Sequence, residues 1–147
     1  MATGPTQSAE DYLERIHELI QHKGRARVMD IATSLNVTRA SVTNMIQRLG
    51  EQGYLEYVRY RGVVLTPRGR EVALRVRRRH ATLSRFFSLL GLDEAVQQRD
   101  IEGIEHHLSA DTLAALVDLT RFFEENPAVL DRFRHSRAGR DGKSPSA

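Results

Sequence analysis

Hydrophobic residues recur at helical spacing through the first third of the chain. Over residues 9–22 they form a single stripe, which predicts an amphipathic helix that ends at Gly24. A shorter pattern over residues 28–35 predicts a second helix, and Thr38 is the predicted N-cap of a third helix that runs to about Gly50. Two short helices joined by a tight turn are typical of a helix-turn-helix.

The pattern changes from helical to alternating after Gly53. Residues 54–58 and 63–66 alternate in hydrophobicity as β-strands do, and Arg59–Gly62 between them form the predicted tip of a hairpin. A helix-turn-helix followed by a hairpin with a basic tip is a winged helix. The exposed face of its last helix and the hairpin tip carry side chains suited to base edges and phosphates. These candidate DNA-binding residues are Arg39, Ser41, Thr43, Asn44, Gln47, Arg48, Arg59 and Arg61.

Helical patterning resumes downstream of the hairpin. A long helix is predicted over residues 67–90, followed by helices over 93–107 and 110–125 and by a last short turn of helix from Pro127. From His135 onward the sequence has no apolar content and is predicted to be disordered. The predicted fold class is therefore mainly α with a small β-hairpin, in which an N-terminal winged helix-turn-helix precedes a helical module.

Composition narrows the function classes. The 147 residues include no cysteine, which excludes disulfides, zinc–thiolate sites and cysteine nucleophiles and favours a cytoplasmic location. No apolar run approaches the length of a membrane span, and we expect no secretory signal. Residues 1–80 hold 14 Lys and Arg against 8 Asp and Glu, whereas residues 81–147 hold 8 against 11. A basic first half and an acidic second half suggest a nucleic-acid-facing module joined to a module with another role.

Potential metal ligands form three clusters on separate predicted helices. Their carboxylates and imidazoles favour divalent first-row ions, and Mn(II) suits carboxylate-rich six-coordination. Four carboxylates also match two divalent ions in charge. The alternative interpretation is that the acids are surface residues favoured by helix dipoles and that the histidines are polar helix residues. The clusters are Asp11 with Glu14, then His80, then Glu102, Glu105 and His106 on one helical face, while His17, His22 and His135 are assigned to the surface.

Several strings in register resemble the diphtheria toxin repressor family of metal-activated regulators, and most closely its short manganese-sensing branch. The likeness covers about residues 7–134, and its most specific part is EGIEHHLS in register with the upstream DYLE and RRH. In iron-sensing relatives the positions of Asp11 and Glu105 carry a methionine and a cysteine. Oxygen donors at both positions therefore favour manganese over iron. The remaining strings are SAEDYLERI, VMDIATSLNVTRASVTNMIQRL, YRGVVLTPRG and DIEGIEHHLS.

The resemblance implies a role for each part of the chain. It implies a Mn(II)-activated repressor of manganese-uptake genes that binds palindromic double-stranded operator DNA as a homodimer. It also implies two Mn(II) ions per subunit, with Fe(II), Co(II) or Cd(II) as substitutes, and no catalytic activity, small organic substrate or membrane partner. The implied metal ligands are Asp11, Glu14, His80, Glu102, Glu105 and His106. The expected parts are a winged helix-turn-helix DNA-binding domain at 1–66, a helical metal-binding and dimerisation domain at 67–134, and a disordered tail at 135–147.

Two other functions remain open at this stage. A metal-independent winged-helix regulator would keep the helix-turn-helix and the wing, and its acidic clusters would be surface charge. A carboxylate di-metal enzyme is the third hypothesis, because Glu14 and His17 have an i, i+3 spacing found in such sites. Those sites lie inside long four-helix bundles, however, and here a predicted hairpin interrupts the helices. The sequence also shows no nucleophile–base pair and no glycine-rich phosphate loop.

Overall fold

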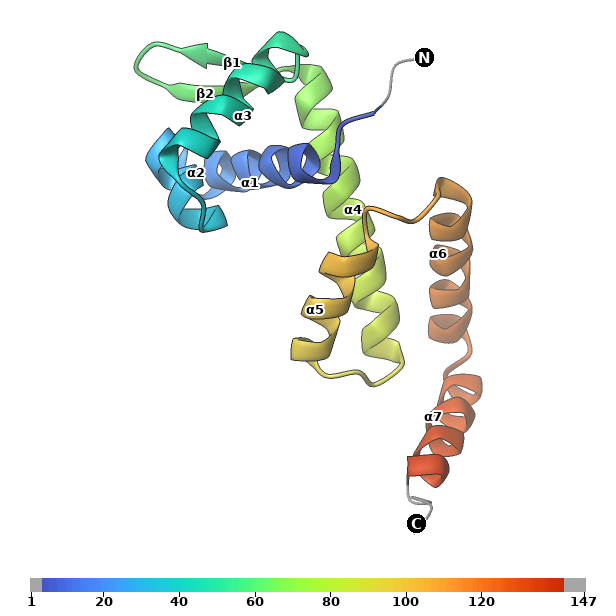
Figure 1. Cartoon of the computed structure of the whole chain (residues 1–147). Coiled ribbons are helices and arrows are strands. Elements are labelled where there is room, and N and C mark those ends of the chain that lie inside the picture. The colour runs from blue at the N-terminus through green and yellow to red at the C-terminus, as the bar shows by residue number, and fades with distance from the viewer. Residues whose placement is uncertain (1–3, 142–147) are drawn as a thin grey trace. The chain divides into compact units, whose positions relative to one another are not determined.

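The helices and strands of the chain fall into two compact units, which divide between Arg78 and Arg79 (Figure 1). The structure is a computed structural model that describes residues 4–141. Its secondary structure is mainly α-helical with one two-stranded antiparallel hairpin, as the sequence predicts. In the described range, no helix is both long enough and apolar enough to cross a membrane.

The first unit begins with three helices whose ends are fixed by side-chain and glycine caps. Helix α1 (Gln7–Lys23) ends at Gly24, which adopts the left-handed conformation with φ of 75°. Helix α2 (Val28–Leu35) matches its predicted range. Helix α3 (Arg39–Glu51) begins at Thr38, whose hydroxyl accepts a hydrogen bond from the backbone N–H of Ser41 at 3.1 Å. The tight turn between α2 and α3 makes the helix-turn-helix.

The wing is a hairpin of β1 (Leu55–Val58) and β2 (Gly62–Leu65), and a short segment before α2 extends it. The backbone N–H of Val63 donates to the carbonyl of Ala26 at 2.9 Å, so Ala26 bridges to β2. Gly62 has a φ of 82°, and a Cβ there would lie 2.5 Å from the Ala26 carbonyl oxygen. This close approach requires glycine and fixes β2, at the end next to the hairpin tip, against the segment before α2.

Helix α4 (Pro67–Leu89) closes the core of the first unit with its first half. Val72, Ala73 and Val76 are buried there together with apolar residues of α1, α2, α3 and the wing. Gly69 lets the start of α4 approach the wing, because a Cβ at this position would overlap the backbone carbonyl of Tyr54. The first unit therefore ends inside α4, about three turns beyond the expected boundary at residue 66.

The second unit contains the end of α4 and three further helices: α5 (Glu94–Ile104), α6 (Ala110–Glu125) and α7 (Pro127–Asp141). Gln97 of α5 is buried, and its amide donates to the carbonyl of Leu92 at 2.7 Å. Its side-chain oxygen also accepts from Ser84 and Ser88 of α4. An ion pair between Arg85 and Glu124 joins α4 to α6. Polar contacts therefore contribute much of what holds these helices together.

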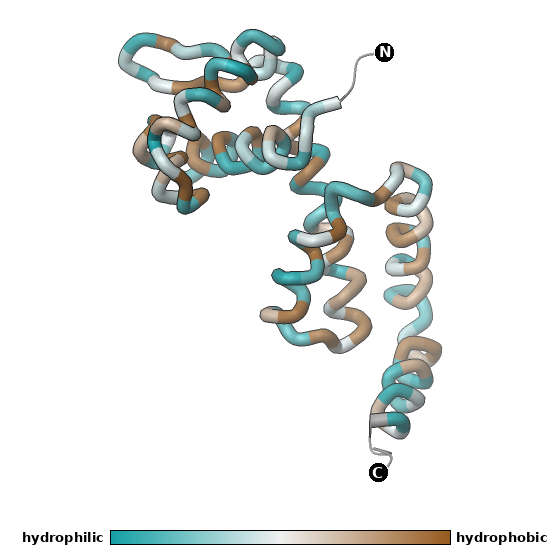
Figure 2. Tube along the Cα trace, in the orientation of Figure 1, coloured by the Kyte–Doolittle hydropathy of each residue, from teal (hydrophilic) through white to brown (hydrophobic). Residues whose placement is uncertain are grey.

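Two predictions about the second unit are wrong. Helix α5 ends at Ile104 rather than at residue 107, because the His107 N–H bonds to the carbonyl three residues back and tightens the last turn. The segment from His135 is helical to Asp141 rather than disordered, and residues 142–147 lie outside the described range. Figure 2 shows the end of α7 to be largely hydrophilic. An exposed helix needs few apolar residues, so their absence did not indicate disorder.

Candidate metal centre and nucleic-acid interface

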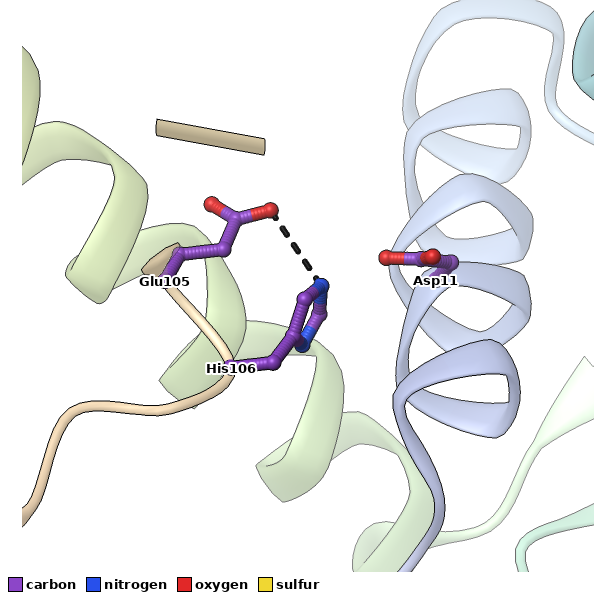
Figure 3. A group of neighbouring side chains, drawn as sticks. All are labelled: Asp11, Glu105 and His106. Atoms are coloured by element: carbon purple, nitrogen blue, oxygen red, sulfur yellow. Dashed lines mark ion pairs between the residues drawn. The ribbon is translucent and has the colours of Figure 1, made fainter. Parts of the chain in front are cut away.

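A buried carboxylate lies between two imidazoles in the second unit. Glu105 is 4% exposed, and it occupies the position directly after α5. Its Oε2 atom lies 3.2 Å from Nδ1 of His80, and its Oε1 atom lies 3.4 Å from Nε2 of His106. Figure 3 shows the ion pair between Glu105 and His106. Each carboxylate oxygen thus faces one imidazole nitrogen, which can donate to it when it carries the proton.

The two histidines reach Glu105 from different elements. His80 lies on α4, and its side chain is 35% exposed. His106 lies in the tightened turn after α5, and its side chain is only 3% exposed. His106 therefore reaches Glu105 from the turn that follows α5, and His80 reaches it from α4. These three residues, which we call the 80–105–106 cluster, are brought together by folding of the second unit alone.

The remaining predicted ligand of α5 is placed differently. The carboxylate of Glu102 is exposed, and within residues 4–141 it makes no hydrogen bond or ion pair. The sequence placed Glu102, Glu105 and His106 on one face of a single helix. Helix α5 ends at Ile104, but Glu105 keeps right-handed helical dihedral angles and its N–H bonds to the Ile101 carbonyl at 2.9 Å, so Glu102 and Glu105 still lie about one helical turn apart.

Asp11 and Glu14 lie three residues apart on α1 of the first unit, where both are half-buried. Asp11 is the third residue labelled in Figure 3. Between them, Tyr12 is buried, and burial raises the pKa of its phenol, which keeps that oxygen protonated and unsuited to metal binding. The spacing of Asp11 and Glu14 places their carboxylates on one side of the helix.

His17 is buried rather than at the surface, which corrects its assignment from the sequence. Burial lowers the pKa of its imidazole, and the positive charges of Arg77 and Arg70 on α4 lower it further, against an opposing contribution from Glu18. The neutral form of His17 is therefore favoured in the folded first unit. Its neighbours are core residues and arginines, so a role in a di-metal enzyme site gains no support here.

The donor chemistry of these residues fits a divalent first-row ion. The candidate ligands supply carboxylate oxygens and imidazole nitrogens only, and the chain has no thiolate that would select zinc or an iron–sulfur cluster. A carboxylate that is 4% exposed is costly unless positive charge or hydrogen bonds compensate it. In the 80–105–106 cluster the two imidazoles supply that compensation, and a cation would supply more.

The predicted DNA-reading face of α3 is exposed. All six of its predicted residues, which are Arg39, Ser41, Thr43, Asn44, Gln47 and Arg48, are at least partly open to solvent. The hydroxyls of Ser41 and Thr43 make local bonds, because Thr38 donates to the Ser41 hydroxyl and Thr43 donates to the Arg39 carbonyl. Asn44 and Gln47 make no side-chain hydrogen bond within the described part of the chain, so their amides are available to base edges.

The wing tip presents basic and aromatic side chains. Arg59 and Arg61 are exposed, and the guanidinium of Arg59 lies over the Tyr60 ring at 5.2 Å from its centroid. The sequence did not single out Arg25 and Arg27, which lie just before α2 and are also exposed. The sequence does contain a signal for them, because Lys23, Arg25 and Arg27 form a short basic run. The bridge between Ala26 and β2 places this run beside the wing.

Two domain models of one family together match most of the chain. The iron-dependent repressor N-terminal DNA-binding domain matches residues 5–63, and the iron-dependent repressor metal-binding and dimerisation domain matches residues 66–134. The chain is 46% identical over 137 residues to the HTH-type transcriptional regulator MntR of Shouchella clausii (strain KSM-K16). That alignment covers 93% of this chain and 96% of the relative, which is named as a regulator and not as an enzyme.

Comparison with solved structures indicates the same family. The crystal structure of T. acidophilum IdeR is 33% identical with a TM-score of 0.68, and the match covers 82% of this chain and 55% of that one. A manganese-dependent transcriptional repressor in complex with manganese is 28% identical with a TM-score of 0.66, over 78% of this chain and 53% of that one. The chain thus spans little more than half the length of these two proteins. It belongs to the iron-dependent repressor family, and it has both the DNA-binding domain and the metal-binding and dimerisation domain of that family.

Proposed function

We propose that this chain is a Mn(II)-activated transcriptional repressor that binds palindromic operator DNA as a homodimer and controls manganese-uptake genes. The observation that carries the proposal is a buried carboxylate between two imidazoles in the same chain as an exposed helix-turn-helix face. Such a regulator of chromosomal operators would act in the cytoplasm. The solved relative with bound manganese supports the choice of metal.

The proposed ligand set contains all six residues singled out from the sequence. Glu105, His80 and His106 form its core, because they already meet in the second unit. Asp11 and Glu14 add carboxylates from α1, and Glu102 adds an exposed carboxylate from α5. A bound ion supplies positive charge that compensates these acids, and we propose two Mn(II) ions per subunit.

The proposed DNA interface combines the exposed face of α3 with the wing tip. Arg39 and Arg48 suit phosphates or guanine edges, and Asn44 and Gln47 suit adenine. Ser41 and Thr43 can still accept hydrogen bonds at their hydroxyl oxygens. Arg59 and Arg61 would contact phosphates or the minor groove beside the wing.

The proposed homodimer has a candidate surface in the second unit. Ile104, Leu119, Phe122 and Val129 are large hydrophobic residues that are exposed on α5, α6 and α7. Only Leu83, Ile101 and Leu130 are buried apolar residues among those described in this unit. A unit with so small a core and so many exposed apolar side chains gains stability by pairing with a second copy. The match to a dimerisation domain supports this interpretation.

A metal-dependent selection tests the proposal. Purified full-length protein is mixed with a random-sequence duplex pool with and without Mn(II), and bound duplexes are enriched and sequenced. We expect a palindromic sequence only with Mn(II), and a gain in affinity of about 5- to 150-fold when Mn(II) is added to the labelled duplex in an anisotropy titration. Sedimentation of the complex should give two protein chains per duplex.

Each possible outcome distinguishes the alternatives. An enriched sequence that binds equally well without metal would refute metal activation and favour a metal-independent regulator. No enriched sequence under either condition would refute operator binding altogether. Fe(II), Co(II) and Cd(II) are titrated in parallel. We expect each ion to raise the DNA affinity, at a concentration that differs from ion to ion, because all three can bind oxygen and imidazole ligands.

A further inference from the structure

A basic groove lies between the wing and the start of α2, and it includes residues that the sequence did not assign to DNA. Its volume is about 670 Å³, and it is lined by residues of the loop before α2, of α2, of α3 and of the wing. Four arginines line it: Arg25 and Arg27 before α2, Arg39 at the start of α3, and Arg59 at the wing tip. We call this the wing groove.

The charge of the wing groove is unbalanced. None of its four guanidinium groups forms an ion pair within residues 4–141. The acid that lines it, Asp30, is already engaged, because it accepts a hydrogen bond from the Arg27 backbone N–H at 3.3 Å and lies 3.7 Å from the Lys23 ammonium. Four like charges that face one groove repel one another unless an anion enters it.

The shape and position of the groove indicate which anion enters. Arg39 belongs both to the groove and to the proposed DNA-reading face of α3, and Arg59 belongs both to the groove and to the proposed wing contact. The groove is therefore continuous with the proposed DNA interface. Exposed Tyr57 and Tyr60 also line it, at 72% and 84% exposure, and their hydroxyls can donate to phosphate oxygens.

We propose that Arg25 and Arg27 hold the sugar–phosphate backbone of operator DNA in the wing groove, so that the DNA interface extends from α3 and the wing tip to the loop before α2. This inference rests on the proposed function as a DNA-binding regulator. Because contacts to phosphate carry no sequence information, the two arginines add affinity that is independent of sequence. Asn44 and Gln47 on α3 would supply the sequence dependence.

The test compares full-length wild type with the double variant Arg25→Gln, Arg27→Gln on labelled duplexes. Removal of the charges is expected to weaken binding to operator and to unrelated duplex by the same factor, at least about tenfold near 0.1 M salt. The slope of log affinity against log salt concentration should become shallower by about 0.9 for each phosphate that the variant no longer neutralises. The lysine variant Arg25→Lys, Arg27→Lys keeps the charges and should retain most of that slope.

Arg15→Gln removes one arginine charge from the same unit at a position outside the groove, so twice its effect on log affinity is the baseline for the double variant, which removes two charges. Its effect measures the general loss of positive charge. Thermal unfolding of all variants checks that the fold is retained, and the Arg27 backbone N–H that bonds Asp30 is present in every one of them.

The outcomes separate this inference from the proposed function. If wild type binds DNA but the glutamine double variant loses no more than twice what Arg15→Gln loses in log affinity and in slope, the phosphate groove is refuted while the repressor proposal stands. If the loss is confined to operator and absent on unrelated duplex, the arginines read bases and the inference is again wrong. If wild type gains no affinity with Mn(II), the repressor proposal fails, and the slope on unrelated duplex still tests the groove.

Discussion

Replacing Glu105 with glutamine is the most direct perturbation of the proposed metal centre. The amide keeps the shape of the side chain, so the packing around this buried position is preserved, but the negative charge is lost. In the wild type, His80 and His106 each face a carboxylate oxygen, which accepts hydrogen bonds. In the variant, one of these oxygens is replaced by an amide nitrogen, so one of the two imidazoles faces a hydrogen-bond donor instead. We expect a folded protein that binds Mn(II) weakly and no longer gains DNA affinity from it.

The size of the effect follows from the position of Glu105. It is 4% exposed and is the group that joins His80 to His106. Loss of residues that only orient metal ligands commonly costs about 10- to 100-fold in metal affinity. Loss of a charged ligand that also orients two others should therefore cost at least about 100-fold, or about 2.7 kcal/mol. A metal–DNA coupling of about 1–3 kcal/mol then disappears at Mn(II) concentrations that saturate wild type.

Calorimetric titration of Mn(II) and anisotropy titration of the selected operator measure the two effects separately. Glu94→Gln is the matched control, since Glu94 is an exposed acid in the first turn of the same helix and outside the proposed ligand set. It should behave as wild type in both assays. Glu105→Gln with wild-type Mn(II) affinity and wild-type activation would refute the reasoning that makes this carboxylate the centre of the site. Circular dichroism and thermal unfolding confirm that the variants are folded.

Three further outcomes are expected. Glu102→Gln should lower the calorimetric Mn(II) stoichiometry from two ions to one per subunit, because the proposed ligand set uses its exposed carboxylate outside the 80–105–106 cluster. An unchanged stoichiometry contradicts the proposed role of Glu102. Gly69→Ala should lower the free energy of unfolding, measured in urea, by about 1–3 kcal/mol, because the new Cβ would overlap a backbone carbonyl. Gly50→Ala in α3 is the control, since its new methyl group would meet its neighbours at ordinary van der Waals distance. That variant should be neutral or more stable by up to about 1 kcal/mol. Folding lowers the pKa of His17, so the unfolded chain binds the proton more tightly than the folded chain does. The free energy of unfolding is therefore highest above about pH 6.5 and falls as the pH drops toward the folded pKa. His17→Gln should reduce this loss in urea titrations at several pH values, and the same pH dependence in variant and wild type would contradict the argument.

The winged helix was predictable because its signals are local. Gly24 and Thr38 end and begin helices through their own backbone and side-chain chemistry, and both are confirmed in that role. The hairpin was predictable for the same reason, since alternation and a turn are properties of neighbouring residues. The exposure of the α3 face followed from helical period alone.

The errors arise where distant segments decide the outcome. His17 is a polar residue on an amphipathic helix, and both its burial and its exposure to the charges of Arg70 and Arg77 on α4 arise from the tertiary packing of the first unit. Glu105 lies beside His80, which is 25 residues earlier in the sequence, and no hydrophobic period encodes that contact. The sequence found Glu105 and His106 as candidate ligands, but the contact of Glu105 with a histidine of α4 follows only from the packing of the second unit.

The order of ligands and core residues along α1 and α4 bears on how metal and DNA would be coupled. On α1, Asp11 precedes the fully buried Leu13 by two residues. On α4, His80 follows the fully buried Val76 by four residues, which is about one helical turn. Both helices thus carry candidate ligands within about a turn of residues that form the core behind the DNA-reading face. In the proposed repressor, a restraint on these ligands acts on two helices that share a buried core with Val42 and Leu49 of α3, so the coupling needs no separate relay of side chains.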